Sequence, residues 1–327
     1  MLKMYAWGGA TGDWRGSKKY DYGSARAKYD KAASAAGATG TRTFATRREP
    51  DMGLVDPRGK TITTDSVDPI VIGIDVTGSM IDWPGEIFDR LPLLYQTLAK
   101  YRPNAEFSFC AIGDATSDRF PLQVNDFSKD INELEKAVKA LGAEGGGGGQ
   151  ITESYELFGY YMLNHCKTPN ATSPFLLIFG DETFYNKVNP DQVKHYVGDD
   201  MQSPLSSKEM WRNLMQRFEL FYLQKPYGRG DAIITSDVKG KWSKTIGRQR
   251  VIDIPSMDRS VDIGMGLIAK QWGEYADFTG SLDARHDDTG LKSSVHKSLR
   301  HIDGDPSVKS ITRKSSGSKL TDSLLGD

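Results

Sequence analysis

Oxygen-bearing side chains at alternate positions follow one strand-length apolar run of this sequence. Residues 70–74 read Ile-Val-Ile-Gly-Ile and lead directly into Asp75, Thr77 and Ser79. A carboxylate and two hydroxyls are hard oxygen ligands, which Mg²⁺ prefers over nitrogen or sulfur. Gly78 allows a tight turn between the two hydroxyl residues. The pattern predicts a cation site where the strand ends, and the alternative is a helix cap, since the same residue types cap helices.

Two later segments place oxygen ligands in comparable positions. A glycine run at 145–149 is followed by Gln150 and Thr152 at the predicted start of a helix. Residues 175–179 form another apolar run, and Asp181 follows it after one glycine. The glycine run lacks the Gly-Lys-Ser/Thr of a phosphate-binding loop, which excludes that nucleotide site.

Together the three segments resemble the metal-ion-dependent adhesion site of von Willebrand factor type A (vWA) domains. The resemblance rests on Asp-x-Thr-x-Ser at 75–79, the polar residues after the glycine run, and the apolar strand that ends near Asp181. It implies one Mg²⁺ or Mn²⁺ ion held by oxygen ligands from all three segments: Asp75, Thr77, Ser79, Gln150, Thr152 and Asp181. The family has Thr or Asp in the middle segment, so Gln150 and Thr152 are alternatives for that ligand.

Apolar patterning around these segments predicts alternating strands and helices. The predicted strands are 70–74, 105–112, 120–124, 175–179, 219–223 and 250–254. The predicted helices include residues 87–98, 131–141, 152–164, 207–217 and 257–272. Ser128 is the predicted N-cap of the second helix. Such alternation favours an α/β fold with a mostly parallel sheet and helices on both faces. The vWA resemblance implies a doubly wound, Rossmann-like order, in which ligands bind beyond the carboxyl ends of the strands.

Composition divides the chain into three parts. Residues 1–66 contain 12 Lys and Arg against 7 Asp and Glu, and aromatic residues recur among the basic ones. We interpret them as an irregular arm that anchors on its own domain or on a neighbouring subunit. Residues 67–272 form the predicted vWA domain, with a long polar insertion at 224–249. Residues 273–327 lack an apolar period and are predicted to be a flexible polar tail.

The overall composition excludes several classes of protein. The net charge of −1 gives no reason to expect nucleic acid or a membrane surface as a partner. Two cysteines cannot build a disulfide scaffold, and the N-terminus lacks the apolar core of a signal peptide. A cytoplasmic location is the resulting expectation.

These observations favour a binding module over an enzyme. The vWA resemblance implies a cation with one position open for an acidic side chain of a protein partner. It also implies an adaptor or scaffold role beside an AAA+ ATPase of the MoxR-like group.

Two alternatives compete with this hypothesis. A Mg²⁺-dependent hydrolase or phosphotransferase would need a general base near the ion, and Asp114 is the candidate. A structural assembly protein would instead form oligomers through the N-terminal arm.

Overall fold

The computed structural model of this protein describes residues 44–143, 151–228, 230–285 and 289–302. Most of the predicted arm, the glycine run with Gln150, and the chain beyond residue 302 lie outside these described residues. The predictions made for them stay predictions.

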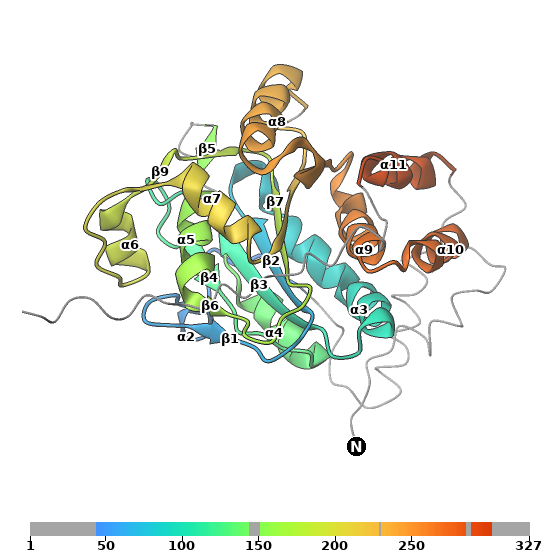
Figure 1. The fold of residues 1–327 in the computed structure, drawn as a ribbon, viewed down its shortest axis with the longest axis horizontal. Helices are drawn as coiled ribbons and strands as arrows, with labels where there is room; N and C mark the ends of the chain where they lie inside the picture. The colour runs from blue at the N-terminus through green and yellow to red at the C-terminus, as the bar shows by residue number, and fades with distance from the viewer. Residues whose placement is uncertain (1–43, 144–150, 229, 286–288, 303–327) are drawn as a thin grey trace, which may run out of the picture.

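A six-stranded, mostly parallel sheet forms the centre of the protein (Figure 1). Its strands run in the order β12-β11-β7-β2-β3-β4, and only β4 is antiparallel to its neighbour. Their bounds are β2 Pro69–Asp75, β3 Glu106–Ile112, β4 Leu122–Val124, β7 Phe175–Gly180, β11 Glu219–Gln224 and β12 Val251–Asp253. The predicted α/β class and all six predicted strands are confirmed, with ends that differ by up to two residues.

The central strand β2 is apolar up to its last residue, Asp75, and both of its faces are covered. All seven of its residues are buried, as expected for a parallel strand between two layers of helices. Side chains alternate between the faces: Ile70 and Ile72 join one apolar core, and Val71 joins the other.

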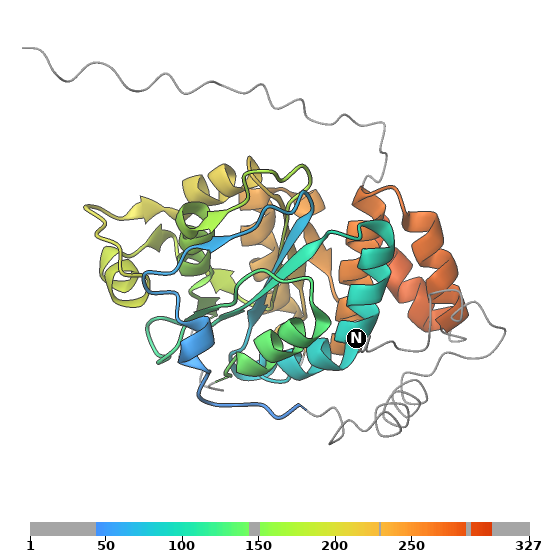
Figure 2. The same cartoon turned by 90° about the horizontal axis from the view of Figure 1, so that it is seen from below.

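Helices cover both faces of the sheet (Figures 1 and 2). The core containing Ile70 and Ile72 includes residues of α3, α4, α9, α10 and α11, and the core containing Val71 includes residues of α5, α6, α7 and α8. The helix bounds are α2 Met52–Val55, α3 Trp83–Tyr101, α4 Ile131–Ala140, α5 Tyr155–His165, α6 Pro190–Tyr196, α7 Ser207–Met215, α8 Ala232–Ile246, α9 Ser260–Gln271, α10 Tyr275–Arg285 and α11 Thr289–Leu299. Asp130, rather than the predicted Ser128, caps α4 by accepting hydrogen bonds from two backbone N–H groups.

Short elements complete the description. Three two-stranded pairs join β1 Ile62–Thr63 with β6 Cys166–Lys167, β5 Thr152–Glu153 with β8 Thr183–Phe184, and β9 Lys187–Val188 with β10 Leu205–Ser206. The described residues also contain three 3₁₀ turns, η2 Gly78–Met80, η3 Arg248–Arg250 and η4 Met257–Arg259. The β5·β8 pair matters for the site because it joins the segment just after Ile151 to the segment that follows β7.

The structure corrects the predicted polar insertion at 224–249. This segment contains the 15-residue helix α8, which buries Val238, Trp242 and Ile246. The Trp242 ring stacks on Tyr222 with 4.2 Å between the ring centroids. Each of these buried residues follows the previous one by four positions, so the sequence contains a narrow apolar stripe of helical spacing within an otherwise polar segment.

The predicted outer parts of the chain are also corrected where the structure describes them. Residues 275–285 and 289–299 form helices α10 and α11, which lie against α9 rather than in a flexible tail (Figure 1). At the other end, β1 pairs with β6, and Phe44 packs on Phe88 with 5.4 Å between the rings. The packed part of the chain therefore extends beyond 67–272 on both sides.

Candidate functional site

The carboxyl ends of β2 and β7 bring Asp75 and Asp181 to one edge of the sheet. The two strands are neighbours, and their pairing sets Ile74 opposite Phe179. Asp75 is therefore level with Gly180, one residue before Asp181. After β2 the chain continues to β3 on one side, and β7 leads to β11 on the other, so the two loops diverge at this point. Ligands of open α/β sheets bind at such a divergence.

Asp75 is fully buried and held by three hydrogen bonds. Its Oδ1 accepts from the backbone N–H of Thr77 at 2.9 Å and from the Thr77 hydroxyl at 2.7 Å. Its Oδ2 accepts from the Tyr155 hydroxyl at 2.5 Å. A Cβ at Gly180 would lie 2.0 Å from that hydroxyl oxygen, so Gly180 makes the Tyr155 contact possible.

Burial and the neighbouring charge disfavour ionisation of Asp75. Loss of water contact, followed by repulsion from Asp181, raises the pKa of Asp75 to about 7, while the Thr77 and Tyr155 hydrogen bonds act in the opposite direction. Asp181 is also buried, and its Oδ2 lies 3.0 Å from the Nζ of Lys225. The Lys225 ammonium places one positive charge beside the two aspartates.

Two further carboxyls, which the sequence analysis missed, belong to this cluster. Glu153 is buried, and burial together with the charges of Asp75 and Glu182 raises its pKa to about 11. Burial and the charges of Asp75 and Asp181 raise the pKa of Glu182 to about 8. One oxygen of each glutamate is buried without a hydrogen-bond partner among the described residues. A signal existed, because each glutamate directly follows a predicted ligand, Thr152 or Asp181.

The remaining predicted ligands are Thr152, Ser79 and Gln150. Thr152 lies in β5, and its hydroxyl is 2.9 Å from the hydroxyl of Thr183. Ser79 lies in the 3₁₀ turn η2, and its side chain is outside the described part of the protein, as is Gln150. Asp75, Thr77 and Asp181 are thus the predicted residues that the described structure brings to one edge.

Asp114, the candidate general base, is already engaged. It is buried and accepts hydrogen bonds from the Thr116 hydroxyl at 2.6 Å and from the Tyr185 hydroxyl at 3.1 Å. These bonds join the loop after β3 to the residue that follows β8.

The chemistry of the cluster matches a hard cation, although a complete metal cage is not formed. In the described ranges, no group of three or more His, Cys, Asp or Glu side chains has the arrangement to hold a metal ion. Mg²⁺, however, is usually bound by one or two carboxylates, with water filling the other positions. Asp75, Asp181 and the Thr77 hydroxyl fit that donor set, and the unpartnered glutamate oxygens leave buried acceptors beside it.

Comparison with known proteins gives weak similarity only. No protein-family profile and no curated protein sequence matches the chain. Among solved structures, the pilus adhesin SpaC from Lactobacillus rhamnosus GG in its open conformation matches 66% of this chain and 31% of the adhesin, with 14% identity and a TM-score of 0.45. Proximal thread matrix protein 1 from the mussel byssus matches 66% of this chain and 49% of that protein, with 10% identity and a TM-score of 0.43.

These similarities are too low to assign a family or a function. The chain also corresponds to less than two thirds of the length of either protein. Among the described residues, no helix combines the length and the apolar character needed to cross a membrane.

Proposed function

We propose that this protein is a divalent-cation-dependent protein-binding module of the vWA type, with a doubly wound sheet. The observation that carries the proposal is the meeting of Asp75, Thr77 and Asp181 where the loops after β2 and β7 diverge. Among the described residues, Lys225 forms an ion pair with Asp181, and the other buried carboxyls at that edge have raised pKa values. A divalent cation would take the place of the protons that these carboxyls otherwise hold at neutral pH.

The roles of the residues follow from their positions. Asp75, Thr77 and Ser79 would supply oxygen ligands from the first loop, and Asp181 would contribute through water. Gln150 or Thr152 would supply the ligand of the middle segment, and Glu153 is a further donor there. Mg²⁺ or Mn²⁺, when bound, supplies a Lewis-acidic position that an acidic side chain of a partner can occupy.

The proposal assigns binding rather than catalysis to this edge. Asp114, the general-base candidate, already accepts hydrogen bonds from the Thr116 and Tyr185 hydroxyls, so the proposal gives it a structural role. The wider proposal is a cytoplasmic adaptor or scaffold that works beside an AAA+ ATPase of the MoxR-like group. This wider role rests on the vWA resemblance.

Cation binding is tested by thermal unfolding in EDTA and in increasing Mg²⁺ or Mn²⁺. We expect the cation to raise the unfolding midpoint of the natural protein, because a ligand that binds only the folded state stabilises it by mass action. Asp75→Asn and Thr77→Val should remove most of this increase. Asp200→Asn, at an exposed surface pair with Lys194, is the matched control and should respond as the natural protein does.

Two results would contradict the proposal. One is a midpoint in the natural protein that does not respond to either cation. The other is an equal response in Asp75→Asn and the natural protein, since the ion would then bind elsewhere. Turnover of a phosphoester that depends on Mg²⁺ and Asp75 would favour the hydrolase hypothesis instead.

A further inference from the structure

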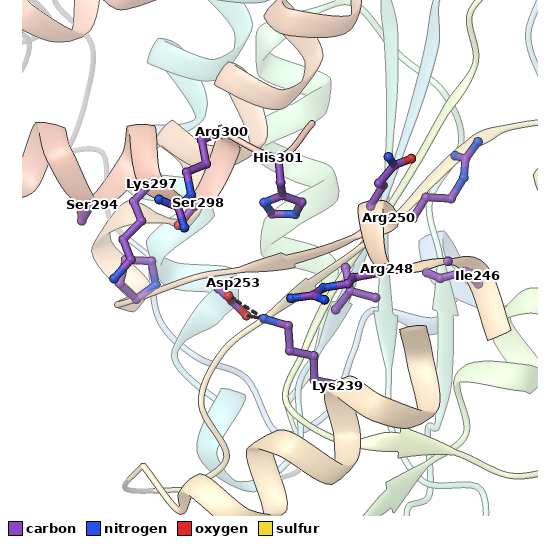
Figure 3. Close-up of a pocket in the computed structure, with 14 residues that line it drawn as sticks. Lys239, Ile246, Arg248, Arg250, Asp253, Ser294, Lys297, Ser298, Arg300 and His301 are labelled. Atoms are coloured by element: carbon purple, nitrogen blue, oxygen red, sulfur yellow. Dashed lines mark hydrogen bonds and ion pairs between the residues drawn. The ribbon is translucent and has the colours of Figure 1, made fainter. Parts of the chain in front are cut away.

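A second site candidate lies at the β12 edge of the sheet. A cleft of about 850 Å³ opens between the C-terminal half of α8, the turn η3, strand β12 and helix α11 (Figure 3). This volume falls within the range of small-molecule sites, about 300–1,000 Å³. None of the residues proposed above as cation ligands lines it.

Positive charge dominates the lining of this cleft. Cationic and potentially cationic side chains come from α8, η3, α11 and the residues just after α11: Lys239, Arg248, Arg250, Lys297, Arg300 and His301. Asp253 is the one carboxylate among the lining residues. Figure 3 shows Lys297, Arg300 and His301 on one side of the cleft, with Lys239 and Arg248 on the other.

Only two of these cations are neutralised by acids within the described structure. Lys239 pairs with Asp253 at 2.7 Å, and Arg250 pairs with Glu219 at 3.2 Å. No described residue forms an ion pair with Arg248, Arg300 or Lys297, all of which are exposed. Within the described residues, the cleft therefore holds positive charge without an acidic partner, from two separate parts of the chain.

The remaining lining adds a hydroxyl. Ser298 is 7% exposed, and its hydroxyl has no hydrogen-bond partner in the described part of the chain. Ile246 and Val251 also line the cleft, but they are buried in the core and offer a ligand almost no apolar surface. Arginine forms paired, charge-assisted hydrogen bonds with phosphate, and a nearby hydroxyl can donate another.

We propose that this cleft binds a small phosphate-bearing molecule. Arg248 and Arg300 approach the phosphates from opposite sides, Lys297 adds charge, and Ser298 donates a hydrogen bond. The site is independent of the proposed cation site, so each proposal can fail alone.

Binding is tested by calorimetric titration of the full chain with inorganic tripolyphosphate in EDTA. We expect saturable binding of one molecule per chain. Arg248→Ala with Arg300→Ala should weaken the affinity about tenfold or more, since each charge-assisted contact contributes substantially. Both side chains are exposed and form no ion pair with another described residue, so the double variant should fold as the natural protein does.

The control is Lys208→Ala with Arg212→Ala, which removes the same charge from exposed positions on α7. This variant should bind tripolyphosphate with unchanged affinity. Equal weakening in both double variants, or no saturable binding at all, would overturn the proposal. So would tighter binding of a short single-stranded oligonucleotide than of tripolyphosphate, because the surface would then serve a nucleic acid.

Discussion

Single residues at the carboxyl edge of the sheet carry unusual protonation equilibria. Glu156 of α5 is 1% exposed, and its Oε2 accepts a hydrogen bond from the Tyr185 backbone N–H at 2.9 Å. Burial raises the pKa of Glu156 to about 8; Asp114 adds to the rise, and Lys241 opposes it. In the folded protein this carboxyl therefore holds its proton at neutral pH.

The pKa of Glu156 predicts how stability depends on pH. The protonated Glu156 stabilises the folded state fully below the unfolded pKa of about 4.5. This stabilisation decreases as pH rises through the folded pKa of about 8, because unfolding then releases the proton that Glu156 holds. The expected slope is at most about 1.4 kcal/mol per pH unit in that window. Urea unfolding at several pH values should show a flatter profile for Glu156→Gln. Parallel profiles for the two proteins would contradict the prediction.

At the scale of elements, the close packing of α10 and α11 on α9 depends on one glycine. A Cβ at Gly266 would lie 2.6 Å from Leu299 Cδ1 and 2.6 Å from Phe278 Cε1. Both partners are fully buried and belong to the same core as β2 and α3. The absence of a side chain at this position lets all three helices meet.

Gly266→Ala should therefore destabilise the protein, by about 1–3 kcal/mol in the free energy of unfolding, because the added methyl group overpacks the contact. Gly280→Ala is the control: its Cβ would meet nothing within 4 Å, and alanine favours a helix over glycine. Chemical denaturation of both variants measures the difference. Equal free energies of unfolding for the two variants would contradict the prediction, because the helices would then accommodate the added methyl group without loss of stability.

For the whole molecule, the question is where the folded unit ends. Helix α9 is buried along nearly its entire length, from Ser260 to Ala269. Part of that cover comes from α10 and α11, which contribute Phe278, Leu282, Val295 and Leu299 to the core. The described helices after residue 272 thus belong to the domain rather than to an appendage.

Ending the chain at residue 272 should expose apolar surface of α9. We expect a lower thermal midpoint and more aggregation than in a control chain that ends at residue 302, which keeps both helices. Light scattering during thermal unfolding measures both quantities. A chain of residues 1–272 that matches the control in midpoint and solubility would restore the boundary predicted from sequence.

Local sequence was sufficient for the central sheet and for the first site residues. The runs at 70–74 and 175–179 are long and apolar enough to specify buried parallel strands, whatever surrounds them. Residues that directly follow such strands must lie at the sheet edge, so Asp75 and Asp181 could be placed from sequence. Helices α8, α10 and α11 were missed because few of their residues are buried. Their apolar stripes are therefore weak, and their sequences resemble polar segments.

Tertiary structure alone decided what surrounds those two aspartates. Strand order made β2 and β7 neighbours, and the absence of a side chain at Gly180 admitted Tyr155 to Asp75. Burial and the charges of neighbouring carboxyls raised the pKa values of Glu153 and Glu182. Local patterns determine which residues end a strand; the electrostatics of a buried site depend on groups distant in sequence, which only the packed chain brings together.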